Sequence, residues 1–189
     1  MSIRPTLMHI LAISGSLRTA SANTSLLRAV ARLAPTDVVV TFYDGLDDLP
    51  HFSPERDVAN APSSVSKLRT QLRDADAVLI CTPEYAHGIP GVLKNMLDWI
   101  VSSGEFVGKP TCVISAATDG SYAHASLTET LFMLSAHIVE GASLVVSFVR
   151  TKIDAEGHIT DAQTTVALQT VISALVGAVQ LNHPATSHG

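Results

Sequence analysis

Short apolar runs alternate along this chain with longer segments whose apolar residues recur every three or four positions. An apolar run without polar alternation is typical of a strand covered on both faces, and such strands occur in parallel sheets. Right-handed crossovers then place helices on both faces of the sheet. The pattern predicts an α/β fold, a doubly wound five-stranded parallel sheet with helices on both faces. The five runs lie at residues 7–13, 37–43, 75–82, 110–117 and 138–149.

The helical segments and the ends of the chain complete this outline. With 189 residues, 47% of them apolar, the chain is long enough for one core, so we expect a single domain over residues 1–189. Residues 150–161 lack periodicity and predict a small irregular excursion with a hairpin, and residues 183–189 predict a frayed tail. Helices are expected around residues 26–33, 65–72, 90–100, 122–136 and 168–179.

Composition excludes several classes of function. The 12 basic and 17 acidic side chains give a net charge of -5, which disfavours a nucleic-acid surface. We expect no signal peptide and no membrane-spanning segment, and therefore a soluble cytoplasmic protein. Cys81 and Cys112 lie in apolar runs and predict buried thiols rather than a disulfide or a metal site. The eight histidines show no metal-ligand spacing.

The loop after the first predicted strand has the chemistry of a phosphate site. In such sheets, ligands bind beyond the carboxyl ends of the strands. The loop reads SGSLRTASANTS from Ser14 and opens a helix, whose unpaired N–H groups attract an anion. The alternative is a serine-rich turn with an ordinary N-cap, which needs only one hydroxyl. The loop is neither a Walker loop, a dinucleotide fingerprint nor a nucleophile elbow. Its polar side chains are Ser14, Ser16, Arg18, Thr19, Ser21, Asn23, Thr24 and Ser25.

A second loop follows the third predicted strand and reads TPEYAHGIPGVLKNMLDW from Thr82. Its prolines and glycines fix the backbone, while Tyr85 and His87 offer flat or polar contacts. A phosphate monoester on the first loop and a ring edge on the second are what flavin mononucleotide (FMN) would need.

These two loops closely resemble the two signatures of the NAD(P)H-dependent FMN reductases, flavodoxin-like enzymes that include quinone, azo-dye and chromate reductases. The resemblance implies that the first loop holds the FMN phosphate, chiefly through Ser16, Arg18, Ser21 and Asn23. It also implies that the second loop borders the flavin ring and that Ser115 contacts the ring from the fourth strand. The full set of expected cofactor contacts is Ser14, Ser16, Leu17, Arg18, Ser21, Asn23, Thr24, Pro83, Glu84, Tyr85, Ala86, His87, Gly88 and Ser115.

Two loops depart from the family pattern. The family often has Asn after the Glu-Tyr pair, where this chain has Ala86 and then His87. The loop after the fourth strand keeps Gly120 but adds Asp119 and Tyr122. We expect the ring contacts, and with them the substrate preference, to differ on this side.

The implied function is an FMN-dependent oxidoreductase that passes hydride from NADPH or NADH through bound FMN to a small acceptor in a ping-pong cycle. The acceptor would be a quinone, a free flavin, an azo compound or a metal oxyanion. Because the flavin carries the redox chemistry, we expect no catalytic side chain. The resemblance implies a homodimer or homotetramer. The alternatives are a non-catalytic FMN-binding sensor or electron carrier, and a flavin-free nucleotide-binding domain. The low aromatic content, 5%, and the modest charge disfavour a carrier. Trp99 lies at helical spacing with Met96 and Ile100, which favours a core position.

Overall fold

A computed structural model describes residues 7–58 and 61–182; the predicted tail at 183–189 lies outside them. The five strands form one parallel sheet in the order β2-β1-β3-β4-β5. The predicted doubly wound sheet is therefore confirmed. Every residue of β3 is buried, as expected for the central strand of a sheet covered on both faces. The strands are β1 (Met8–Ser14), β2 (Val38–Tyr43), β3 (Ala77–Thr82), β4 (Pro110–Ala117) and β5 (His137–Ser147).

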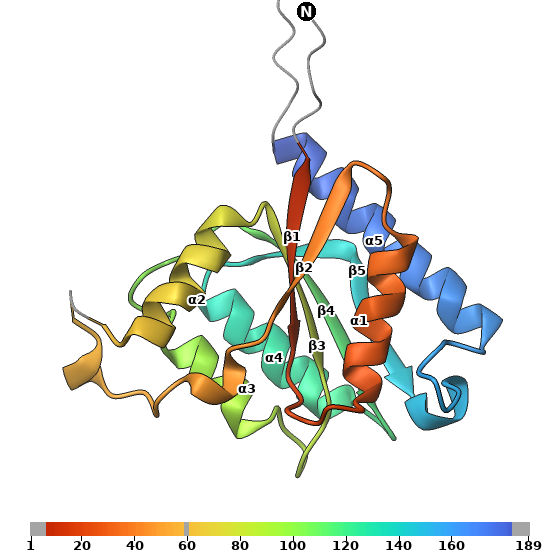
Figure 1. Ribbon diagram of the computed structural model, residues 1–189, viewed down its shortest axis with the longest axis horizontal. Helices are drawn as coiled ribbons and strands as arrows, with labels where there is room; N and C mark the ends of the chain where they lie inside the picture. Colours follow the sequence, from red (N-terminus) through yellow and green to blue (C-terminus); the bar gives the residue numbers. More distant parts are fainter. Residues whose placement is uncertain (1–6, 59–60, 183–189) are drawn as a thin grey trace, which may run out of the picture.

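Helices cover both faces of the sheet, as predicted (Figure 1). Helices α1 (Ala22–Leu33) and α5 (Ala162–Asn182) lie on one face. Helices α2 (Ser63–Asp74), α3 (Gly91–Asp98) and α4 (Ser121–Met133) lie on the other.

Several helix boundaries differ from the sequence-based expectation, and two of the differences have a clear structural cause. Pro90 is the N-cap of α3 rather than part of its first turn. Helix α4 ends at Met133, three residues before the predicted end, because Ser135 adopts a left-handed backbone conformation with φ 58°. That conformation closes a helix rather than extending it.

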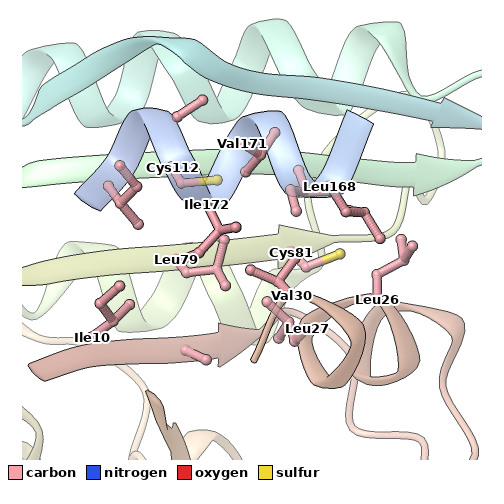
Figure 2. Packing of buried hydrophobic residues seen from close by; sticks show 14 of the residues in the cluster. Ile10, Leu26, Leu27, Val30, Leu79, Cys81, Cys112, Leu168, Val171 and Ile172 are labelled. Atoms are coloured by element: carbon pink, nitrogen blue, oxygen red, sulfur yellow. The ribbon is translucent and has the colours of Figure 1, made fainter. Parts of the chain in front are cut away.

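Each face of the sheet has its own buried cluster of apolar side chains. Figure 2 shows side chains of α1, such as Leu26 and Val30, and of α5, such as Leu168, directed at β3 and β4. Cys81 and Cys112 lie fully buried in this cluster. Burial raises the pKa of both thiols, so both stay protonated at neutral pH. The prediction of buried free thiols is confirmed.

Among the described residues, α5 alone is long and apolar enough to cross a membrane, judged by length and composition. The helix has 21 residues, and an 18-residue window within it has a mean hydropathy of 1.5. It packs through its buried face, which includes Leu168, Ile172 and Leu175, against β4, β5 and α1. In this structure α5 therefore serves as a core helix.

Trp99 occupies the core on the opposite face. Its side chain is fully buried, its Nε1 donates to the carbonyl of Pro50 at 2.8 Å, and its ring meets Phe52 edge to face. The predicted core position of Trp99 is confirmed, and its ring packs against the loop after β2.

Candidate functional site

A cavity of about 940 Å³ opens at the carboxyl ends of the strands. The β1–α1 loop, the loops after β3 and β4, and the excursion between β5 and α5 form its walls. Figure 1 shows the β1–α1 loop and this excursion at the same edge of the sheet. The predicted site residues that line the cavity are Ser16, Arg18, Ser21, Asn23, Thr24, Pro83, Glu84 and Tyr85.

The β1–α1 loop is built around the N-cap of α1. Ser21 has the extended backbone of an N-cap, and its Oγ accepts hydrogen bonds from the Asn23 amide at 3.2 Å and from Asn23 Nδ2 at 3.4 Å. Asn23 Oδ1 in turn accepts from the Cys81 thiol at 3.3 Å. Gly15 donates its amide to the Cys81 carbonyl at 2.8 Å. These bonds fix the start of α1 on the end of β3.

The loop still presents donors to the cavity. Ser21 uses both acceptor sites of its hydroxyl, so its O–H remains able to donate, and Asn23 Nδ2 keeps a second N–H. Across residues 7–58 and 61–182, the guanidinium of Arg18 forms no ion pair or hydrogen bond. Hydroxyls, a free guanidinium and a helix N-terminus fit a phosphate dianion, so the donor set suits the phosphate of FMN.

Two of the predicted loop residues lie outside the cavity lining. Ser14 Oγ accepts hydrogen bonds from Thr24 Oγ1 at 3.2 Å and from the Ser16 amide at 3.4 Å. These bonds stabilise the β1–α1 loop. The Leu17 side chain is 48% exposed and is not part of the cavity wall.

The loop after β3 makes a tight turn. Tyr85 and Gly88 exchange two backbone hydrogen bonds of 3.0 Å, and the two residues between them have positive φ, 49° at Ala86 and 58° at His87. These are the features of a type I′ turn, which usually carries Asn or Gly. Ala86, His87 and Gly88 do not line the cavity; Pro83, Glu84 and Tyr85 do.

The two departures from the family pattern meet in space. The His87 ring stacks on the Tyr122 ring with centroids 4.2 Å apart and planes 12° apart. Glu84 Oε2 accepts the amide of Ala123 at 2.9 Å, in the first turn of α4. The turn after β3 is therefore tied to the start of α4 at two places.

Ser115 faces away from the cavity. It is fully buried, and its Oγ bonds His124 Nδ1 at 3.0 Å, while His124 Nε2 bonds Ser143 Oγ at 2.7 Å. Burial lowers the pKa of His124, which favours the neutral ring. The wall at the end of β4 consists instead of Ala116, Ala117 and Thr118.

The fourth wall of the cavity was not predicted from the sequence. It comprises residues 148–151 and 153–157. Residues 153–159 form the expected hairpin through an antiparallel bridge between Ile153 and Ile159. Arg28 of α1 also lines the cavity. The sequence shows a polar segment with several charged residues at 150–161, but the hydrophobic pattern does not indicate that this segment lies beside α1.

Comparison with known proteins agrees with this architecture. A model of the family described as NADPH-dependent FMN reductase matches residues 8–151. An NAD(P)H-dependent FMN reductase of Pseudomonas aeruginosa is 32% identical, covering 89% of this chain and 93% of the relative. A 2-hydroxy-1,4-benzoquinone reductase of Burkholderia sp is 34% identical, covering 86% and 91%. The structure of FerB, a flavoenzyme NAD(P)H:(acceptor) oxidoreductase from Paracoccus denitrificans, superimposes with a TM-score of 0.75 at 28% identity and covers 92% of this chain and 98% of FerB.

The family match covers well over half of the chain, and both relatives align over most of their own length. The resemblance drawn from the two loops is thus confirmed: this chain belongs to the NADPH-dependent FMN reductase family and is an oxidoreductase of the flavodoxin-like fold.

Proposed function

We propose that this protein binds FMN in the cavity at the carboxyl ends of the strands and transfers reducing equivalents from NAD(P)H to a small acceptor. One observation carries the proposal. The free guanidinium of Arg18 and the donors of Ser21 and Asn23 gather at the N-terminus of α1, inside a cavity that continues along the ends of β3 and β4. The phosphate would bind at this helix start, and the ring would lie toward Pro83, Glu84 and Tyr85.

In this proposal the protein positions the reactants, and bound FMN supplies the hydride chemistry. The positive charge of Arg18 would offset part of the phosphate charge, and the hydroxyls of the β1–α1 loop would donate hydrogen bonds to the phosphate. Glu84 and Tyr85 shape the wall beside the ring, and their loop is held by the bond from Ala123 to Glu84. Residues 116–118 replace Ser115 as the proposed contacts after β4.

We propose quinones as the first acceptors to test, because the Burkholderia relative is named a benzoquinone reductase. Free flavins, azo compounds and metal oxyanions remain the other proposed classes. The nicotinamide nucleotide gives up a hydride, which is two electrons and one proton, and the quinone gains these together with a second proton from solvent. Donor and acceptor would use the same open side of the site in turn, which gives ping-pong kinetics.

We also propose that the protein is a homodimer, or a homotetramer built from such dimers. Phe132 and Met133 at the end of α4 are 68% and 72% exposed. Val107 is 66% exposed in the adjoining loop, which is joined to this helix end by the Gly108 amide and the Ser135 carbonyl at 2.8 Å. Burying this apolar patch against a second copy would remove it from water. The free buried thiols agree with a cytoplasmic location.

Anaerobic stopped-flow spectroscopy tests the function. The FMN-loaded protein is mixed with NADPH or with NADH, and the flavin absorbance is followed. It is then mixed with a benzoquinone. We expect a nicotinamide nucleotide to bleach the flavin and the quinone to restore its yellow colour. In separate steady-state measurements with both substrates varied, we expect parallel lines in double-reciprocal plots of the rate. A stable yellow colour would favour the sensor or carrier. A colourless protein whose melting temperature does not respond to FMN would favour a flavin-free domain.

A further inference from the structure

The excursion between β5 and α5 extends the cavity beyond the phosphate loop. The volume of the cavity, about 940 Å³, lies at the upper end of the range for one small-molecule site, about 300 to 1,000 Å³. The excursion packs closely on α1, because a Cβ added at Gly157 would lie only 2.8 Å from Ser25 Oγ. Asp154 closes its hairpin by accepting the His158 amide at 2.7 Å. The segment is therefore a formed wall of the cavity.

Besides Arg18, two further guanidinium groups line the cavity. Arg28, on α1, and Arg150, in the short helix η3 (Val149–Lys152), line the cavity and form no ion pair with any described residue. Arg18 already serves the β1–α1 loop, and FMN carries one phosphate. Asp154 and Glu156 also line this wall, but Asp154 is engaged with His158. The additional arginines suit a second anionic group.

Phe148 provides an independent observation on the same wall. Its backbone has a φ of 52°, its side chain is 61% exposed, and it lines the cavity. A bulky residue with positive φ is uncommon, and such conformations cluster at ligand sites. The conformation is held by bonds from the Phe148 amide to the Thr118 carbonyl at 3.4 Å and from the Thr151 amide to the Phe148 carbonyl at 2.9 Å. Phe148 therefore offers an accessible aromatic ring to the same cavity that Arg28 and Arg150 line.

We propose that Phe148, Arg150 and Arg28 form a subsite for the adenosine 2′,5′-bisphosphate part of NADPH, and that this subsite gives NADPH preference over NADH. An aromatic face stacks on a base, and guanidinium groups bind phosphate in two-pronged hydrogen bonds. Arginine is the residue that accommodates a 2′-phosphate in dinucleotide sites. The inference rests on the proposed function in that it takes the nucleotide to be the electron donor.

Calorimetric titration of 2′,5′-ADP and of 5′-AMP into the FMN-loaded protein and into the apoprotein tests the subsite. We expect 2′,5′-ADP to bind more tightly than 5′-AMP to the unsubstituted protein. Arg150→Ala should lower the affinity for 2′,5′-ADP by about tenfold, the loss expected for one charged hydrogen bond, and should lower the affinity for 5′-AMP less. Phe148→Ala should weaken both ligands. The matched control is Arg32→Ala, one turn beyond Arg28 on α1 and outside the cavity lining, which should change neither.

The same variants are then examined for FMN binding and for KM. Arg150→Ala should raise KM for NADPH by about tenfold and leave KM for NADH and the Kd of FMN near their original values. The inference is overturned if 2′,5′-ADP does not bind, if Arg150→Ala behaves as Arg32→Ala does, or if Arg150→Ala weakens FMN instead. Failure of the proposed function looks different, because then FMN itself would not bind or would not be reduced by either nucleotide.

Discussion

Replacing Gly15 by Ala tests how closely the β1–α1 loop packs on the sheet. A Cβ at this position would lie 3.0 Å from both Leu93 Cδ2 and Thr82 Oγ1. Both neighbours are fully buried, so neither can move away freely. Overpacking of this kind costs about 1 to 3 kcal/mol, and the lower entropy of the unfolded chain returns about 0.4 to 1 kcal/mol. We therefore expect Gly15→Ala to lower the free energy of unfolding by about 1.3 kcal/mol, the difference between the middles of these two ranges.

Urea denaturation of the apoprotein measures this loss, provided that the m-value is unchanged. Gly177→Ala is the matched control, because this glycine lies inside α5 and an added Cβ would meet nothing within 4 Å. The control should gain about 0.5 to 1 kcal/mol. If Gly15→Ala proved as stable as the unsubstituted protein while Gly177→Ala gained, the loop would not lie against Thr82 and Leu93 as described.

Further substitutions test the turn, the histidine and the excursion. Ala86→Gly should stabilise the protein by up to about 1 kcal/mol, because φ is 49° there, whereas Ala125→Gly on the exposed side of α4 should cost about 0.5 to 1 kcal/mol; thermal melting separates the two. Burial lowers the pKa of His124 below 6.5, so the unfolded chain binds a proton at His124 more readily than the folded protein does. The neutral His124 ring therefore contributes fully to the stability of the fold above pH 6.5, and this contribution is lost as the pH falls below that value. The melting temperature should therefore fall more steeply between about pH 7 and pH 5.5 in the unsubstituted protein than in His124→Gln, and equal slopes would contradict the buried neutral ring. Gly157→Ala should cost about 1 to 3 kcal/mol in urea denaturation, because φ is 85° and Ser25 Oγ is 2.8 Å away, and adding Ser25→Ala should recover only the part due to the clash.

The apolar pattern predicted the sheet and the helices because each run has to be buried. Residues 77–82 contain no exposed position, and the structure places them at the centre of the sheet. The same property limited the prediction for β4. A strand covered on both faces shows no alternation, so the sequence does not reveal that Ser115 points toward α4 while Ala116 borders the cavity.

Contacts between loops that are distant in the chain could not be predicted from the sequence either. The stacking of His87 on Tyr122 depends on the positive φ of His87, and the sequence identified both residues only as departures from a family pattern. Arg150 and Gly157 line the same wall of the cavity, and Gly157 packs closely on Ser25 of α1. Local patterns describe what a segment forms, and these contacts depend on where the formed segments meet.

The comparison of FMN with riboflavin tests the central claim most directly, because the two ligands differ only in the phosphate. Fluorescence titration of the apoprotein gives both dissociation constants, for the unsubstituted chain and for Arg18→Ala. We expect FMN to bind at least about 100-fold more tightly than riboflavin, and Arg18→Ala to reduce that ratio by about tenfold while riboflavin binding stays unchanged. Equal affinity for the two ligands, or a ratio that does not change in Arg18→Ala, would contradict phosphate binding at the start of α1.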